Sequence, residues 1–173
     1  MTISTPRLTL RRFSPDDAAA LFDVFSRPEV ARWSGTGTPM TDVSEAHARI
    51  ERMPARTGDH PAAGIFAVVP NDDPRVVGMA ILVPIPASDG FDRDDLEVGW
   101  HLHPDAWGHG YATEAATALL DRAFAADVAE VYAVTDPDNV RSQAVCRRLG
   151  MTDLGLRTDW YDRELRAFRV DRS

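Results

Sequence analysis

Residues 97–115 read EVGWHLHPDAWGHGYATEA, and this stretch decides the fold. The apolar run over 96–102 predicts a strand, Pro104 marks a turn, and a pair of glycines then opens a helix over 111–124. Glycine lets the main chain approach a ligand, and the start of a helix presents unpaired N–H groups and a positive dipole end. Together these features predict a phosphate-binding turn at Trp107, Gly108, His109, Gly110, Tyr111 and Ala112, with Thr113 as the next candidate for ligand binding.

The residues alone leave two other interpretations of this turn. A tight strand-to-helix turn with no ligand has the same glycine pattern. A Rossmann dinucleotide site would need a third glycine, yet position 113 is Thr, and it would need an acidic residue about 20 positions later at the end of a second strand. The dinucleotide interpretation therefore fits poorly.

Hydrophobic periodicity and turn residues predict the elements on both sides of the turn. Strands are expected at 8–13, 64–69, 76–83, 96–102 and 128–134, with two more over 153–170. Helices are expected at 14–27, 29–33, 41–53, 111–124 and 139–149. This order predicts an α/β protein with helices around one sheet, and the length predicts a single domain over residues 1–173.

Composition narrows the classes of function. The formal net charge of -8 argues against nucleic acid as a partner and favours a cationic or neutral small substrate. A single cysteine, Cys146, excludes a disulfide framework, and the five histidines show no ligand spacing, so no metal is expected. We find no apolar run of about 20 residues for a membrane span and no signal-peptide pattern, so a cytoplasmic location is expected.

Three blocks of the chain carry a family resemblance. They are residues 5–11 (TPRLTLR), 107–115 (WGHGYATEA) and 136–151 (DPDNVRSQAVCRRLGM). In this order they resemble the GNAT superfamily of N-acetyltransferases, in the branch of the ribosomal-protein N-terminal acetyltransferases. Met151 stands where that branch usually has Phe, and Trp107 stands where the wider superfamily often has Arg or Gln.

The resemblance implies a GNAT fold and acetyl-CoA as the acetyl donor. The fold would be a mostly antiparallel sheet, flanked by helices and splayed between its fourth and fifth strands. The pantetheine arm would lie in that gap and pair with the backbone of His101 and Leu102. The pyrophosphate would lie on the glycine turn, with Asn139 and Ser142 also contacting the cofactor.

Glu97 is the candidate general base, because many relatives carry a Glu at this place on the fourth strand. Such a group removes the proton that an ammonium must lose before its nitrogen can attack a thioester. A run of acidic residues precedes it, which would raise its pKa and attract a cationic amine. That run consists of Asp89, Asp92, Asp94 and Asp95. The alternative is that Glu97 merely ends a strand beside a solvated loop.

The general acid is less well defined by the sequence. Many members of the superfamily have a Tyr where this chain has Cys146, and a free cysteine on an amphipathic helix is typically a core residue. In the resembling branch the serine at Ser142 is the suggested donor to the departing thiolate, and water is the alternative. One of Arg141, Arg147 and Arg148 would reach the 3'-phosphate, and the alternative for each of them is a solvated helix face.

The acceptor site is expected at Trp33, Asp159 and Trp160, with Tyr161 beside them, although aromatic residues are equally common in cores. The acceptor would be a primary amine, either a protein N-terminus or a small molecule, and the sequence does not choose between them. A non-catalytic acyl-CoA sensor is the alternative function. Members of the resembling branch are often dimers.

Overall fold

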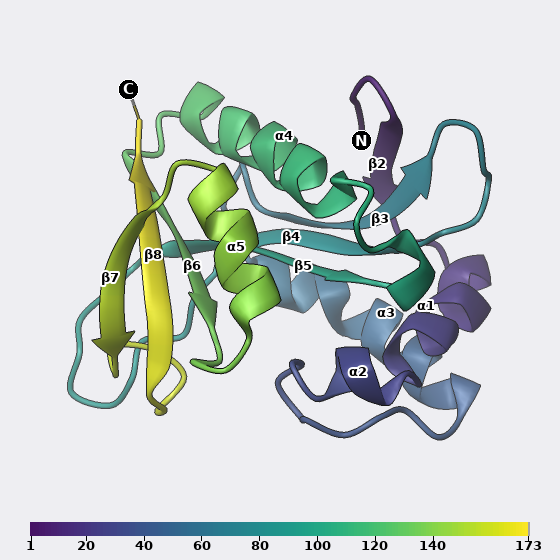
Figure 1. The fold of residues 1–173 in the computed structure, drawn as a ribbon, viewed down its shortest axis with the longest axis horizontal. Helices are drawn as coiled ribbons and strands as arrows, with labels where there is room; N and C mark the ends of the chain where they lie inside the picture. Colours follow the sequence, from purple (N-terminus) through teal and green to yellow (C-terminus); the bar gives the residue numbers. More distant parts are fainter. Residues whose placement is uncertain (173) are drawn as a thin grey trace.

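The computed structural model describes residues 1–172 and contains an eight-stranded sheet in the order β1-β2-β3-β4-β5-β6-β8-β7 (Figure 1). Neighbouring strands are antiparallel, except that β5 and β6 run parallel. The prediction of an α/β fold with a mostly antiparallel sheet is confirmed. The strands are β1 (Thr2–Ser4), β2 (Leu8–Arg12), β3 (Gly64–Pro70), β4 (Gly78–Pro84), β5 (Leu96–Leu102), β6 (Glu130–Thr135), β7 (Thr152–Arg157) and β8 (Leu165–Asp171).

The sheet opens between β5 and β6. β4 and β5 are joined along seven residue pairs, whereas β5 and β6 share the single pair Glu97–Tyr132. Beyond Glu97, no strand within residues 1–172 pairs with β5 on this side, so backbone polar groups there are available to a ligand. These are the fourth and fifth predicted strands, and the predicted position of the gap is confirmed.

Helices cover both faces of the sheet, because successive side chains of a strand point to opposite sides. In β4, Ile81 packs in a core with Leu21 and Ile50, whereas the next residue, Leu82, packs in a core with Leu119. The helices are η1 (Pro15–Asp17), α1 (Ala18–Phe25), α2 (Pro28–Ala31), α3 (Val43–Thr57), η2 (Pro104–Ala106), α4 (Tyr111–Ala125) and α5 (Val140–Arg148). Figure 1 shows α4 on one side of the sheet and α1 to α3 on the other. None of the helices of the described chain is long and apolar enough to cross a membrane.

Two elements differ from the predictions. The short strand β1 was not predicted, since three residues carry too little alternation to be recognised. The helix predicted to end near Met53 continues through Pro54 to Thr57. A proline inside a helix removes one backbone hydrogen bond, but Met53 and Thr57 on either side are buried, and their packing outweighs that loss. The extra turn places Arg56 on α3.

Candidate active site

A cavity of about 1660 Å³ lies at the gap between β5 and β6, bordered by α2, α3, α4 and α5. Single-ligand pockets usually enclose ~300–1,000 Å³, so this cavity has room for two molecules. Most residues of the predicted site lie in its wall, although they come from separate segments of the chain. They are Trp33, Glu97, His101, Leu102, Trp107, Gly108, Gly110, Tyr111, Ala112, Thr113, Asn139 and Ser142.

The glycine turn has the backbone conformation that its sequence requires. Gly108 and Gly110 both have a φ of +79°, which residues with a side chain rarely adopt. Gly110 is the N-cap of α4, and no side chain of the described residues caps this helix. The N–H groups of the first turn therefore keep their capacity to bind an anion at the cavity wall.

Thr5 and Arg7, in the segment between β1 and β2 that we call the N-terminal arm, support this turn by binding Glu114, a residue of α4. One Glu114 carboxylate oxygen accepts hydrogen bonds from the Thr5 hydroxyl (2.6 Å) and the Arg7 amide (2.8 Å), and the other accepts from Arg7 Nε (2.7 Å). The Arg7 guanidinium also donates to the His109 carbonyl at 2.8 Å. The sequence gives no signal of these contacts, because 107 residues separate Arg7 from Glu114.

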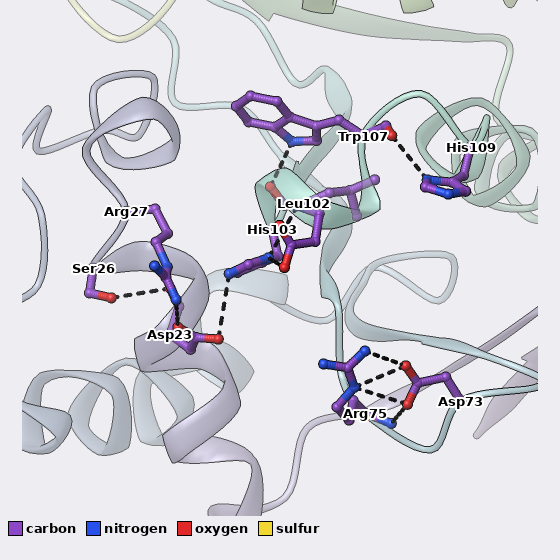
Figure 2. Close-up of polar contacts among 10 residues, drawn as sticks. Asp23, Ser26, Arg27, Asp73, Arg75, Leu102, His103, Trp107 and His109 are labelled. Atoms are coloured by element: carbon purple, nitrogen blue, oxygen red, sulfur yellow. Dashed lines mark hydrogen bonds and ion pairs between the residues drawn. The ribbon is translucent and has the colours of Figure 1, made fainter.

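Trp107 connects the glycine turn to β5 through a hydrogen bond. Its indole Nε1 donates to the Leu102 carbonyl at 2.9 Å, and the His109 ring lies 2.9 Å from the Trp107 carbonyl, as Figure 2 shows. The Arg141 guanidinium lies over the Trp107 ring, 4.5 Å from its centroid. The side chain of His109 is exposed and is not part of the cavity wall, so only its backbone remains a candidate for ligand binding.

Glu97 is a buried carboxyl group in the cavity wall, 8% exposed. The Tyr161 hydroxyl donates to its Oε2 at 2.6 Å, and an Arg56 guanidinium nitrogen lies 4.0 Å from the same oxygen. Burial raises the pKa of Glu97, and the Tyr161 hydrogen bond and the Arg56 charge partly oppose that rise. The predicted cause was wrong: the acidic loop before β5 does not raise this pKa, and desolvation does.

His101 lies on β5, four residues after Glu97, and is neutral at pH 7. Burial and the charge of Arg49 lower the pKa of its imidazole to about 4, while a hydrogen bond with the Trp33 backbone acts in the opposite direction. Its ring centroid is 5.2 Å from that of Phe25. His101 therefore adds no positive charge to the cavity under ordinary conditions.

The start of α5 brings Asn139 and Ser142 to the cavity. The Asn139 side chain accepts from the Ser142 amide at 3.2 Å, which confirms the predicted helix cap. Cys146, one turn further along, is 1% exposed, and burial raises the pKa of its thiol to about 12. An undissociated, buried thiol is inert, so the prediction of a core residue is confirmed.

This geometry has counterparts among known proteins. A family model described as an acetyltransferase (GNAT) domain matches residues 7–152. The chain belongs to the GNAT acetyltransferases. It is 30% identical over 160 residues to the uncharacterized N-acetyltransferase p20 of Bacillus licheniformis, covering 92% of this chain and 86% of that protein.

Solved structures agree with this GNAT fold. An acetyltransferase from Agrobacterium tumefaciens superimposes with a TM-score of 0.77 at 26% identity, covering 98% of this chain and 94% of that one. The ribosomal L7/L12 alpha-N-protein acetyltransferase RimL, solved in complex with coenzyme A, has a TM-score of 0.78 at 16% identity, covering 99% and 98%. At that identity the likeness shows the fold alone.

GNAT acetyltransferases use acetyl-CoA, and the residues of this GNAT chain fit such a ligand. No described atom lies within 4 Å of where a Cβ on Gly108 would stand, so a phosphate can approach the turn closely. Arg141 and Arg148 line the cavity beside the turn and supply positive charge, whereas Arg147 does not line it and lies 4.0 Å from Asp153.

Two predicted acceptor residues of this acetyltransferase lie outside the cavity wall, which disagrees with their expected role. Asp159 is 3% exposed and pairs with Arg157 at 2.8 Å and Arg93 at 3.4 Å. Trp160 is 1% exposed and donates from Nε1 to Asp95 at 2.9 Å. Both residues hold the β7–β8 turn against the sheet. The next residue, Tyr161, is the one that lines the cavity.

Proposed function

We propose that this acetyltransferase transfers an acetyl group from acetyl-CoA to a primary amine, with Glu97 as the general base. One observation carries the proposal. Glu97 is a buried carboxyl group with a raised pKa, and it lines the same cavity as the glycine turn. A carboxylate with a raised pKa is a better proton acceptor near neutral pH than an exposed one.

The chemistry needs no covalent enzyme intermediate. Acetyl-CoA, when bound, supplies the thioester carbonyl carbon at which the new N–C bond forms as the C–S bond breaks. Glu97 accepts the proton that the amine nitrogen loses. The Ser142 hydroxyl, which lines the cavity on the α5 side, donates a hydrogen bond to the leaving sulfur, and a solvent proton completes the free thiol.

Tyr161 and Arg56 act as positioning residues for Glu97 in this proposal. The Tyr161 hydroxyl fixes one carboxylate oxygen at 2.6 Å and so directs the other toward the cavity. Burial and the adjacent Glu97 raise the pKa of Tyr161, so it stays a hydrogen-bond donor over the working pH range. Trp33 would form the wall against which the acceptor lies.

The acceptor class remains a protein N-terminus or a small-molecule amine. RimL, a ribosomal L7/L12 alpha-N-protein acetyltransferase by name, has a ribosomal protein as its acceptor. The present chain shares its fold at 16% identity, so a protein N-terminus belongs in any acceptor panel beside amino acids, amino sugars and polyamines.

A thiol-release assay with acetyl-CoA and this panel tests the proposal, with calorimetric titration of coenzyme A alongside. Acceptor-dependent thiol release is the expected result. Tight binding without turnover for any amine would contradict the proposal and support an acyl-CoA sensor. Absence of coenzyme A binding would contradict the assignment of the glycine turn.

A further inference from the structure

The acceptor side of the cavity is strongly basic, although the whole chain is acidic. The chain has a formal net charge of -8. The cavity wall nevertheless contains seven arginines and three acidic residues. These are Arg32, Arg49, Arg52, Arg56, Arg141, Arg148 and Arg163, with Glu45, Glu97 and Asp136. Arg141 and Arg148 lie beside the glycine turn, which leaves a second basic group on the opposite wall.

α3 carries the core of this second group. Arg49, Arg52 and Arg56 are spaced at i, i+3 and i+7, so they share one face of the helix, and all three line the cavity. Arg32, at the end of α2, also lines the cavity, with its guanidinium 4.3 Å from the centroid of the Trp33 ring. We call these four residues the arginine wall.

Arg49 has no anionic partner within the described chain. Its guanidinium lies 3.9 Å from the centroid of the Phe25 ring, and no ion pair or hydrogen bond within residues 1–172 joins it to an acidic side chain. Burial, together with repulsion from Arg56 and Arg52, lowers the pKa of Arg49 to about 10, so the group is still charged at pH 7. A partly buried charge without a counterion costs free energy, and an incoming anion would remove that cost.

The nearby carboxylates of the described chain leave Arg49 and Arg52 without a counterion. Glu45 accepts hydrogen bonds from Thr41 and from the Asp42 amide at the start of α3, so it serves as a helix cap. Glu97 lies 4.0 Å from Arg56 and is bonded to Tyr161. Arg52, like Arg49, has no acidic partner within residues 1–172.

We propose that the acceptor carries an anionic oxygen group, a carboxylate or a phosphate, which Arg49 and Arg52 bind while its amine faces Glu97. The inference rests on the proposed function. Along α3, Arg52 and Arg49 lie about 6 and 10 Å from Arg56, at a rise of 1.5 Å per residue, and Arg56 lies against Glu97. The amine and the anion are therefore joined by a short chain. This proposal differs from the cationic or neutral substrate expected from net charge alone.

Repulsion from the arginine wall also fits an amine acceptor. A positive potential disfavours the ammonium form and so lowers the pKa of an amine placed there. The same potential would exclude polyamines, which bring further positive charge. The anionic group compensates for this repulsion and gives the site its selectivity.

A matched series of acceptors tests the inference. 6-Aminohexanoate, 5-aminopentyl phosphate, hexylamine and 1,6-diaminohexane have similar lengths and differ at the end away from the amine. We expect the kcat/KM of the better anionic amine to exceed that of hexylamine about tenfold or more, because a hydrogen bond to a charged group contributes roughly 1.5–3 kcal/mol. The ratio between carboxylate and phosphate identifies the group preferred. Equal values for all four amines would overturn the inference and leave the proposed function intact.

Substitutions in the arginine wall provide a second test of the inference. Arg49→Gln and Arg52→Gln should each bring the anionic-to-neutral ratio of kcat/KM toward one, mainly through KM, with coenzyme A affinity unchanged. Arg75→Gln is the matched control, since Arg75 is exposed, pairs with Asp73 (Figure 2) and does not line the cavity. A uniform loss for every amine in the Arg49 and Arg52 variants would contradict a role in selectivity.

A binding measurement separates this inference from the proposed function. Glutarate, a dianion without an amine, is titrated into the protein saturated with coenzyme A. Binding that Arg49→Gln and Arg52→Gln weaken would support the anion site even if no amine in the panel reacted. Absence of glutarate binding, together with equal turnover or no turnover of the four amines, would overturn it.

Discussion

The two ends of the cavity are built in different ways. At the end proposed to bind coenzyme A, called the cofactor end, a six-residue turn presents backbone N–H groups, and its shape depends on two glycines with positive φ. At the end proposed to bind the amine, called the acceptor end, side chains from α2, α3, β5 and the β7–β8 turn line the cavity, and no continuous segment defines the site. The cofactor end depends on the backbone conformation of one short segment. The acceptor end depends on the side chains of several segments that the tertiary fold brings together.

This difference explains which changes each end tolerates. A turn built from backbone binds a phosphate whichever side chains surround it, provided that the glycine conformation is kept. A wall built from charged side chains changes its preference with every substitution. The cofactor end is therefore suited to one donor across a family, and the acceptor end to many different amines.

Glu97→Gln is expected to have the largest effect, and to affect turnover without affecting coenzyme A binding. We expect kcat to fall about 10²–10⁴-fold, because a positioned general base contributes that much. Calorimetry should show coenzyme A binding as in the wild type, since Glu97 lies away from the glycine turn. Turnover at the wild-type level with a true acceptor would remove Glu97 from the mechanism.

Gly110→Val tests the cofactor end. Valine at a φ of +79° is strained by at least about 1–2 kcal/mol, and its Cβ would stand 3.3 Å from an Arg7 nitrogen. Coenzyme A affinity should fall roughly tenfold or more by calorimetry. Gly90→Val is the control, because Gly90 has a φ of +83° but lies outside the cavity. If both variants lost affinity equally, general destabilisation would be the cause.

Glu114→Gln tests whether the N-terminal arm belongs to the cofactor end. The change removes the charge that binds Arg7, and hydrogen bonds to charged groups contribute about 1.5–3 kcal/mol. We expect a lower Tm and a several-fold weaker coenzyme A affinity. Asp73→Asn, which removes an exposed ion pair elsewhere, should leave the affinity unchanged. A lower Tm with normal affinity would limit Glu114 to a structural role.

The smallest effect is a pH dependence of stability from His101, which also lines the cavity. The pKa of His101 is about 4 in the folded protein and 6.5 without burial. The unfolded chain therefore binds a proton that the folded protein does not, and stability should fall as the pH drops from 6.5 to about 4. Urea unfolding at pH 7 and pH 5 should show a smaller difference for His101→Gln than for the wild type. His47→Gln, at an exposed position, should behave as the wild type.

The cofactor end could be predicted from the sequence because the residues that determine its conformation are adjacent in the chain. Two glycines at fixed spacing before a helix predict the conformation of Gly108 and Gly110, and the resemblance over three blocks predicts the sheet gap. The contact of Arg7 with Glu114 could not be read, since it depends on how the sheet brings distant segments together.

The acceptor end was harder to predict for identifiable reasons. The helix was predicted to end at Met53, so Arg56 fell outside it and the face that Arg56 shares with Arg49 and Arg52 did not appear. Asp159, Trp160 and Tyr161 were all candidates, because chemistry alone does not tell which side chain of a turn points into the cavity. Net charge favoured a cationic or neutral small substrate, although the charges within the cavity have the opposite balance.

The Arg7–Glu114 contact also has a consequence for how the protein is made. During synthesis the N-terminal arm leaves the ribosome first, but its partners lie 102 and 107 residues later in the chain. The hydrogen bonds from Arg7 to His109 and Glu114 therefore cannot form until α4 has emerged. In a shorter nascent chain the glycine turn lacks these contacts. A bulky fusion at the N-terminus would act on the coenzyme A end of the enzyme, far from it in sequence.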